Sequence, residues 1–179
     1  MKKVVFLVIT AALILASQAA FAQAGNTASG TLTVTATVNS SISLIFQKDA
    51  AGAAIGGAGT NAATLAFGPV QAFGGTVPAG VTETTGASSF TLSSPVDVVV
   101  NKANSTSANY KLTAQLNAAP SNGESLAVNA LAVTNAAATT INATAAYGTT
   151  VTTVALTIPF TVASGTTISD VINFVATSN

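Results

Sequence analysis

A strict two-residue alternation over residues 31–38 is the feature that most constrains how this chain can fold. The segment reads Thr-Leu-Thr-Val-Thr-Ala-Thr-Val, so each apolar residue is separated from the next by a threonine. Successive side chains of a β-strand point to opposite faces, so this pattern predicts a strand with one apolar and one hydroxyl-bearing face. The apolar face consists of Leu32, Val34, Ala36 and Val38.

The same period of two recurs along the chain, and no segment shows a clear helical period. Alternation is plain over residues 89–101, 109–117 and 151–162, and residues 167–177 close the chain with a further strand. Turns rich in glycine, proline and asparagine separate these segments. The pattern therefore predicts an all-β fold, an antiparallel β-sandwich of roughly seven to nine strands.

Several details of this sandwich follow from the pattern. A short polar connector joins residues 89–101 to 109–117 and predicts a hairpin. Residues 125–134 are expected to form one strand with Ala130 on its inward face, and the glycine-rich residues 74–86 are expected to form a loop. The expected core consists of Phe67, Phe90, Val98, Val100, Tyr110, Leu112, Leu156, Phe160 and Phe174.

Residues 1–22 have the pattern of a secretory signal peptide. Two lysines precede an apolar run over residues 4–16, and an Ala-Phe-Ala triplet, typical of a cleavage site, ends at Ala22. The run is shorter than the roughly 20 residues that span a bilayer. We therefore expect an exported protein with no integral membrane span after cleavage, in which residues 23–41 form an N-terminal extension and residues 42–179 a β-sandwich domain.

The composition argues against several classes of function. The chain has no cysteine, histidine or tryptophan, which excludes a disulfide framework, a thiolate or imidazole metal site and a Ser-His-Asp triad. Five basic residues balance five acidic ones, so no basic surface is available to neutralise nucleic acid phosphates. The carboxylates lie scattered, as Asp49, Glu83 and Asp97 illustrate, and no Asp-x-Asp-x-Asp calcium spacing occurs. We expect no enzyme activity, no cofactor and no metal.

Three features in sequence order resemble a known family. An alternating segment follows the signal peptide, residues 65–70 read Leu-Ala-Phe-Gly-Pro-Val after a variable loop, and residues 165–174 read Gly-Thr-Thr-Ile-Ser-Asp-Val-Ile-Asn-Phe near the end. This order resembles the pilin subunits of chaperone/usher fimbriae and is most similar to the archaic, spore-coat-protein-U-like branch.

The resemblance implies an immunoglobulin-like sandwich that lacks its final strand. In such filaments the N-terminal extension of a neighbouring subunit fills the gap by β-strand addition. The resemblance further implies an acceptor groove beside Ile172 and Phe174, a periplasmic chaperone, an outer-membrane usher, and passage through the periplasm to a fimbrium on the cell surface. The donor face would then be Leu32, Val34, Ala36 and Val38.

Other interpretations of the same residues are open at this stage. Residues 31–38 could be the first strand of a complete sandwich. The protein could instead be a monomeric secreted adhesin or carbohydrate-binding module. Such sites usually use tryptophan or tyrosine side chains as platforms, however, and here only Tyr110 and Tyr147 are available. An ice-binding surface would need threonine rows at a fixed repeat, and no such repeat occurs.

Overall fold

The computed structural model describes residues 29–179, so the predicted signal peptide lies outside the described residues. The chain divides into two units whose boundary falls between Thr37 and Val38. Residues 29–40 form no strand and are exposed along their whole length. The strand predicted over residues 31–38 therefore does not form within the single chain, and the interpretation of this segment as the first strand of a complete sandwich is wrong. A strand needs a hydrogen-bonded neighbour, and none of the described strand pairings includes these residues.

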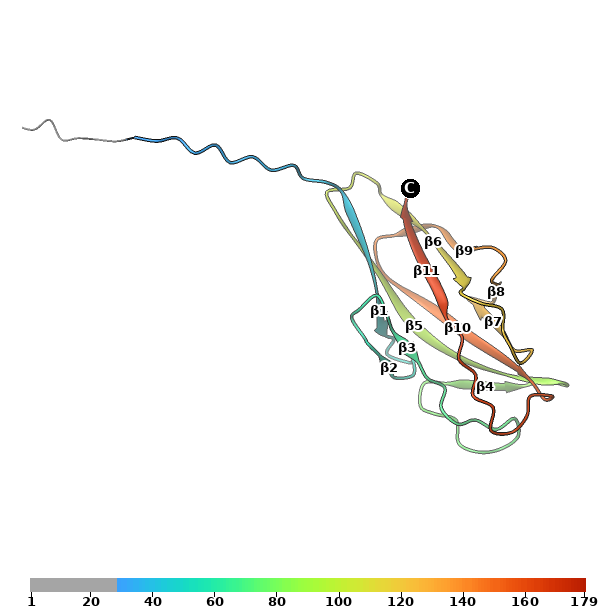
Figure 1. Ribbon diagram of the computed structural model, residues 1–179. Coiled ribbons are helices and arrows are strands. Elements are labelled where there is room, and N and C mark those ends of the chain that lie inside the picture. The colour runs from blue at the N-terminus through green and yellow to red at the C-terminus, as the bar shows by residue number, and fades with distance from the viewer. Residues whose placement is uncertain (1–28) are drawn as a thin grey trace, which may run out of the picture. The chain divides into compact units, whose positions relative to one another are not determined.

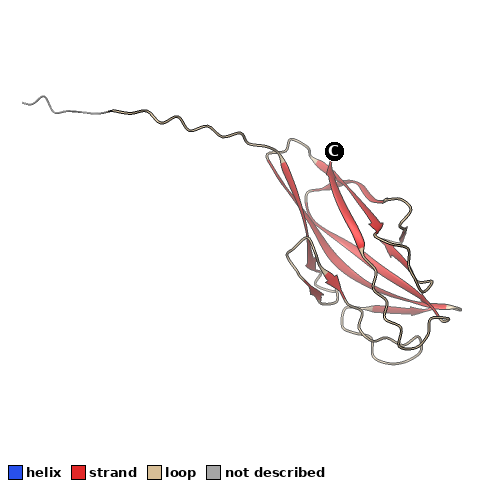
Figure 2. Ribbon diagram, in the orientation of Figure 1, coloured by secondary structure: helices blue, strands red, loops and turns tan. Residues whose placement is uncertain are grey.

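The second unit is built from strands and loops alone (Figure 2), which confirms the all-β prediction. Its larger sheet has the order β1-β5-β10-β7-β8, with β4 also paired to β5, and its second sheet has the order β11-β6-β9. The larger sheet comprises β1 (Ser41–Lys48), β4 (Thr82–Thr85), β5 (Ser89–Ala103), β7 (Ser125–Val128), β8 (Leu131–Val133) and β10 (Gly148–Pro159). The second sheet comprises β6 (Asn109–Leu116), β9 (Thr139–Ala146) and β11 (Ile172–Ser178).

A short hairpin of β2 (Ile55–Gly56) and β3 (Thr64–Leu65) stands beside these sheets, and every strand pairing is antiparallel (Figure 1). The described residues thus contain eleven strands rather than seven to nine, two of which are only two residues long. The additional strands include β4, which lies within the stretch predicted as a loop. Its sequence, Thr-Glu-Thr-Thr, has no apolar alternation, and its pairing with β5 determines its structure.

The core lies between the two sheets in a sandwich-like arrangement. Along β5 the even-numbered residues from Phe90 to Val100 point inward and are buried. Val98 and Val100 pack in one cluster with Tyr110 and Leu112 of β6, whereas Phe90 and Leu92 cluster with Ile158 of β10. The Tyr110 hydroxyl lies 3.3 Å from Thr150 Oγ1 on β10, so the largest buried side chain also has a hydrogen-bond partner.

The predicted hairpin between residues 89–101 and 109–117 is wrong. Strands β5 and β6 lie in different sheets, because β5 is already paired with β1 and β4 along one edge and with β10 along the other. The connector therefore crosses between the sheets. It is held by Lys102, whose ammonium group donates to the Ser107 carbonyl oxygen, and it contains Asn104 with a φ of 56°.

The single strand predicted over residues 125–134 is also wrong. The chain reverses at Asn129 and Ala130, whose φ values of 49° and 62° are typical of a two-residue hairpin turn. Ala130 is therefore exposed in the turn between β7 and β8 rather than inward. The Asn129 side-chain oxygen accepts a hydrogen bond from the Thr153 backbone N–H at 2.8 Å, which anchors the turn to β10.

Most of the expected core residues are covered, but to different degrees. Phe160 is 36% exposed and packs against the exposed ring of Phe73, so its assignment to the core is wrong. It follows Pro159, the last residue of β10, and has left the regular alternation of that strand. Half-buried members are Phe67, Leu156 and Phe174, and buried members are Phe90, Val98, Val100, Tyr110 and Leu112.

Candidate functional site

A groove of about 1020 Å³ opens between the two sheets. Its floor is the inward face of the larger sheet, contributed by β5 and β10. One side is formed by β11 and the segment 165–171 that leads into it, and the other side by residues 61–70 with β1 and β2. The floor residues are Leu92, Val96, Val98, Thr152, Val154, Leu156 and Ile158.

Strand β11 borders this groove with an edge that has no strand partner in the described part of the chain. Its other edge pairs with β6 over its whole length, from Ile172 opposite Leu116 to Ser178 opposite Tyr110. An unpaired edge presents a row of backbone N–H and C=O groups that another strand can use. The edge and the apolar floor therefore offer both the hydrogen bonds and the hydrophobic surface that an added strand requires.

Most of the groove floor is buried, but Val154 and Leu156 on β10 and two residues of β11 are only half-buried. Ile172 and Phe174 are half-buried, whereas their partners on β6, Leu116 and Ala114, are 3% and 0% exposed. Leu156 is half-buried although β10 is flanked by β5 and β7 on its two edges. Residues in the middle of a sheet are exposed in this way only when the layer above them is incomplete.

Aromatic and aliphatic side chains pack against one another along the borders of the groove. The rings of Phe46 on β1 and Phe174 on β11 meet edge to face with 5.4 Å between their centroids. Towards the other end of β5 and β10, Phe67 and Ile168 pack on the buried Phe90 cluster. The groove thus lies between two parts of the core that are already packed.

The chain closes a different gap by itself, along the edge of β5. Pairing with β1 ends at Val96 and pairing with β4 begins at Ser93, and the space between them is filled by a loop. The backbone N–H of Ala53 donates to Ser94 Oγ at 2.9 Å, and Ala53 is buried. Gly52 and Gly80 make this packing possible, because a Cβ atom on Gly80 would overlap the Gly52 backbone.

Two polar side-chain atoms that line the groove are buried without a hydrogen-bond partner. They are Thr152 Oγ1 on β10 and Asp170 Oδ2 in the segment before β11. Burial raises the pKa of Asp170, and the negative charge of Glu124 raises it further. The Glu124 carboxylate itself accepts hydrogen bonds from the backbone N–H groups of Ser121 and Asn122 at 3.2 and 2.7 Å.

A second pair of carboxylates lies away from the groove. Asp97 sits between the inward residues Val96 and Val98, so it points to the outer face of β5, as the alternation predicts. Partial burial raises its pKa, and so do the charge of Asp49 and a hydrogen bond with that carboxyl group. Over residues 29–179, no three histidine, cysteine, aspartate or glutamate side chains gather as a metal site would require.

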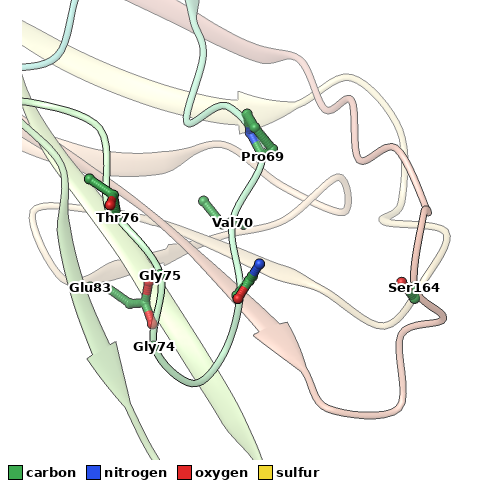
Figure 3. A pocket seen from close by; sticks show the side chains of 8 residues that line it. Pro69, Val70, Gly74, Gly75, Thr76, Glu83 and Ser164 are labelled. Atoms are coloured by element: carbon green, nitrogen blue, oxygen red, sulfur yellow. The ribbon is translucent and has the colours of Figure 1, made fainter.

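A smaller hollow of about 370 Å³ lies among the loops near β4 (Figure 3). Its lining includes Glu83 and Thr76 together with the backbone of Gly74 and Gly75, while Ser164 comes from the segment after β10. In Figure 3 these side chains surround an open space between loops. A single carboxylate in such a setting supplies no acid–base pair of the kind that glycoside hydrolysis uses.

The predicted site residues occupy two places. Ile172 and Phe174, which were predicted to lie beside an acceptor groove, both line the groove between the two sheets. Leu32, Val34 and Val38 are 88%, 83% and 70% exposed, and Ala36 is exposed as well. In the described residues, the apolar face of residues 31–38 is thus exposed to solvent.

Several groove residues were absent from the predicted site. Val154, Leu156 and Ile158 contribute to the floor, and Leu65 lies on one side. Their alternation identified an inward face, but it could not distinguish a covered face from an open one. Thr152 carried no signal, because threonines occupy so many strand positions in this sequence.

No protein-family model matches this chain, and no curated protein or solved structure matches it either. Among the residues that the structure describes, no helix has the length and apolar character needed to cross a membrane.

Proposed function

We propose that this protein is a structural subunit of an exported, fimbria-like surface filament, whose copies join by β-strand addition. The observation that carries the proposal is the groove itself, in which Leu156 and Phe174 are only half-buried beside the unpaired edge of β11. An apolar floor next to a free strand edge is suited to one kind of occupant, an extended segment with alternating apolar side chains.

The strand order supports an immunoglobulin-like sandwich with one strand missing. Immunoglobulin-like domains place strands A, B, E and D in one sheet and C, F and G in the other. The order β1-β5-β10-β7 corresponds to A-B-E-D, and the pair β6-β11 corresponds to C-F. The G position would then lie beside β11, where the groove is, and a strand supplied by another subunit would complete the fold.

The occupant in this proposal is residues 31–38 of a second copy. Their side chains are uncharged, alternate strictly and are exposed in the single chain. Eight residues of strand extend about 27 Å, and the seven residues of β11 extend about 23 Å, so the two lengths match. Burying Leu32, Val34 and Val38 would contribute about 1.5–3 kcal/mol each before ordering costs, comparable with the total stability of a small domain.

The same groove explains the partners expected from the family resemblance. Before assembly, an uncovered apolar groove and a free edge would promote aggregation. A periplasmic chaperone that lends a strand, and an outer-membrane usher that exchanges it for the next subunit, would protect the groove in transit. These partners follow from the proposed function.

A matched pair of double variants tests the donor role of residues 31–38. Leu32→Asp with Val34→Asp places two charges on the apolar face, and Thr33→Asp with Thr35→Asp places the same two charges on the opposite face. We expect the first variant to be exported but to stay monomeric, because charged groups are costly to bury unpaired. The second should polymerise. Size-exclusion chromatography with light scattering gives the assembly state of each.

A peptide experiment tests the groove independently. A chain without residues 23–38 should unfold at a lower temperature than the assembled protein, and a peptide of residues 30–38 should raise that temperature as any ligand of the folded state does. If the full-length protein is a stable monomer and the peptide has no effect, strand addition is excluded. The monomeric adhesin, or carbohydrate-binding module, then becomes the better interpretation.

A further inference from the structure

We infer that the two ends of the β-sandwich dock head to tail in successive copies, so that an end bearing carboxylates and exposed aromatic rings receives the lysine-bearing end of the next copy. The inference rests on the proposed function and goes beyond it, because it assigns a second contact between subunits that lies outside the groove. The partner at this surface is a second copy of this chain.

The acidic end is the end of the sandwich where β5 begins and β10 ends. Glu83 lies on β4, which pairs with the beginning of β5. Glu124 directly precedes β7, which pairs with the second half of β10. Asp170 lies just before the start of β11, close enough to Glu124 for the two charges to interact. Three carboxylates therefore gather at this end.

The basic end is the opposite end, where β1 begins and β11 ends; Figure 1 shows β4 at one end of the sandwich and the end of β11 at the other. Lys102 lies on β5 opposite the start of β1, and Lys111 lies on β6 opposite the end of β11. Both are exposed. The remaining charged side chains of residues 29–179, Lys48, Asp49 and Asp97, lie midway along β5. The two ends of the sandwich thus carry side chains of opposite charge.

An exposed pair of aromatic rings also lies at the acidic end. Phe73 is 72% exposed, and its ring centroid lies 5.1 Å from that of Phe160. Phe160 stacks on Phe90 at the beginning of β5, and the carbonyl oxygen of Ala72 accepts a hydrogen bond from Thr85 on β4. Aromatic rings are enriched on surfaces that a partner protein covers. The acidic end therefore combines an apolar contact area with unbalanced charge.

The short connection between the donor segment and the sandwich brings a second copy to this surface. Only Asn39 and Ser40 separate Val38 from Ser41, where β1 begins at the basic end. The three steps from Val38 to Ser41 span about 11 Å at most. When residues 31–38 fill a groove, the basic end of the donor copy is therefore held beside one end of the acceptor copy.

The charges indicate which end of the acceptor this is. The basic end of the donor is attracted to an acidic end, whereas two basic ends repel each other. The groove extends to the acidic end, where its floor finishes at Ile158. In this orientation Val38 lies near Ile172 and the added strand is antiparallel to β11, like every described strand pair. A head-to-tail contact of this kind generates an open filament unless it closes into a ring.

Single charge reversals test the contact. The full-length chain is diluted from urea into buffer of low ionic strength, and light scattering gives the rate of polymerisation. Lys111→Glu should slow polymerisation about fivefold, because charge complementarity acts mainly on association rates. Lys48→Glu makes the same change midway along the sandwich and should polymerise like the parent. Added salt should reduce the difference between Lys111→Glu and the parent, since it screens exposed charges.

Reversing a charge at each end tests whether the two ends meet. Glu83→Lys alone should slow polymerisation about as much as Lys111→Glu. The chain with both changes should polymerise faster than either single variant, because opposite charges then face each other again. Two reversals that merely add their separate effects would show that these ends do not face each other, and would overturn the inference.

Substitution of Phe73 tests the apolar part of the surface. Phe73→Ser should raise the concentration at which polymers dissociate by about tenfold, as expected for an aromatic side chain buried in an interface. Size-exclusion chromatography with light scattering over a dilution series measures this concentration. Its thermal unfolding should match that of the parent in the monomeric Leu32→Asp, Val34→Asp chain, because the ring is exposed there. Polymers as stable as those of the parent would exclude a role for this ring.

Peptide binding separates a failure of this inference from a failure of the proposed function. Calorimetry measures the affinity of the Leu32→Asp, Val34→Asp chain for a peptide of residues 30–38, and adding Lys111→Glu should leave it unchanged, because the peptide brings no second sandwich. If the peptide binds but Lys111→Glu polymerises at the same rate as Lys48→Glu, the ends do not dock and strand addition stands. If the peptide does not bind and the full-length chain does not polymerise, the proposed function and this inference both fail.

Discussion

Two leucines of this sandwich occupy equivalent kinds of position and have different environments. Leu112 lies on β6, the central strand of its sheet, and is 0% exposed. Leu156 lies on β10, also an internal strand, and is only half-buried. Both lie at inward positions of their strands and point towards the core. The difference shows that the burial of an inward residue depends on the layer opposite it as much as on its own strand.

The two sides of the core differ because the two sheets differ in width. The larger sheet extends from β1 to β8, whereas the second sheet ends at β11. Around Tyr110 both layers are present, and Val100 is buried beneath it. Beside β11 the opposite layer stops, and Val154 and Leu156 on β10 are only half-buried. One additional strand on β11 would make the two sides alike.

Substituting these two leucines should give the largest contrast. Leu112→Ala should lower the free energy of unfolding by about 2–5 kcal/mol, since it leaves a cavity in a closed part of the core. Leu156→Ala should cost only about 1–2 kcal/mol in a chain with an empty groove, because solvent already reaches that side chain. Urea unfolding of both variants in the Leu32→Asp, Val34→Asp chain provides the measurement.

Filling the groove should remove this contrast. With the peptide of residues 30–38 present at saturation, the cost of Leu156→Ala should rise, because its side chain then contacts the added strand. The cost of Leu112→Ala should stay the same. Equal costs for the two substitutions without peptide would mean that the groove is not open in solution.

A smaller effect is expected where the chain closes a gap without a partner. Gly80 has a φ of +79°, and a Cβ atom there would overlap the Gly52 backbone, which itself packs on the Pro95 carbonyl group. Gly80→Ala should therefore destabilise the domain by about 2 kcal/mol, through its left-handed backbone and through displacement of the loop from β5. Thermal or urea unfolding measures the change.

Gly59 is the matched control for this substitution. Its φ of +82° is nearly the same, but nothing lies within 4 Å of a Cβ atom built there. Gly59→Ala should cost about 1 kcal/mol, the backbone contribution alone. If Gly80→Ala costs no more than Gly59→Ala, the loop can move away from β5 without loss, and the contact between the two glycines does not stabilise the gap.

The alternation of the sequence predicted the strands that have an apolar face, and it did so for a physical reason. Residues such as Phe90, Val98 and Leu112 must point to one side of a strand, so their spacing determines which residues face the core. Ile172 and Phe174 were placed at the acceptor by the family resemblance, and both line the groove. The pattern could not show how far the opposite layer extends, so it predicted Leu156 as a core residue without showing that it borders a groove.

The errors arose where partners, rather than local pattern, determine structure. Nothing in β4 alternates, and β5 holds it in place. The connector after β5 is short enough for a hairpin, but both edges of β5 are already paired. Residues 31–38 have the clearest strand pattern in the chain and form no strand, because a strand requires a neighbour. Pairing between distant segments is not encoded in the spacing of any one of them.

The smallest expected effect concerns the pH dependence of stability at Asp170. Burial and the charge of Glu124 raise the pKa of this carboxyl group above its usual value of 3.8 in the folded chain. The folded state therefore binds the proton more tightly than the unfolded state, and stability falls as the pH rises from 3.8 through the raised pKa. Asp170→Asn should remove this loss, so the variant should be slightly more stable than its parent at pH 7 and gain nothing below pH 3.8.

The groove and the outer face should respond differently when the stability of these variants at pH 7 is measured by urea unfolding with and without the peptide of residues 30–38. Asp97 also has a raised pKa, caused by burial and by Asp49, but it lies on the outer face of β5. An added strand that placed a backbone N–H beside Asp170 would favour its charged form, so the bound peptide would then abolish the advantage of Asp170→Asn at pH 7. The effect of Asp97→Asn should be the same with and without peptide. A peptide that binds but leaves both effects unchanged would show that the added strand does not reach Asp170, because only a donor at that carboxylate can offset the cost of its burial.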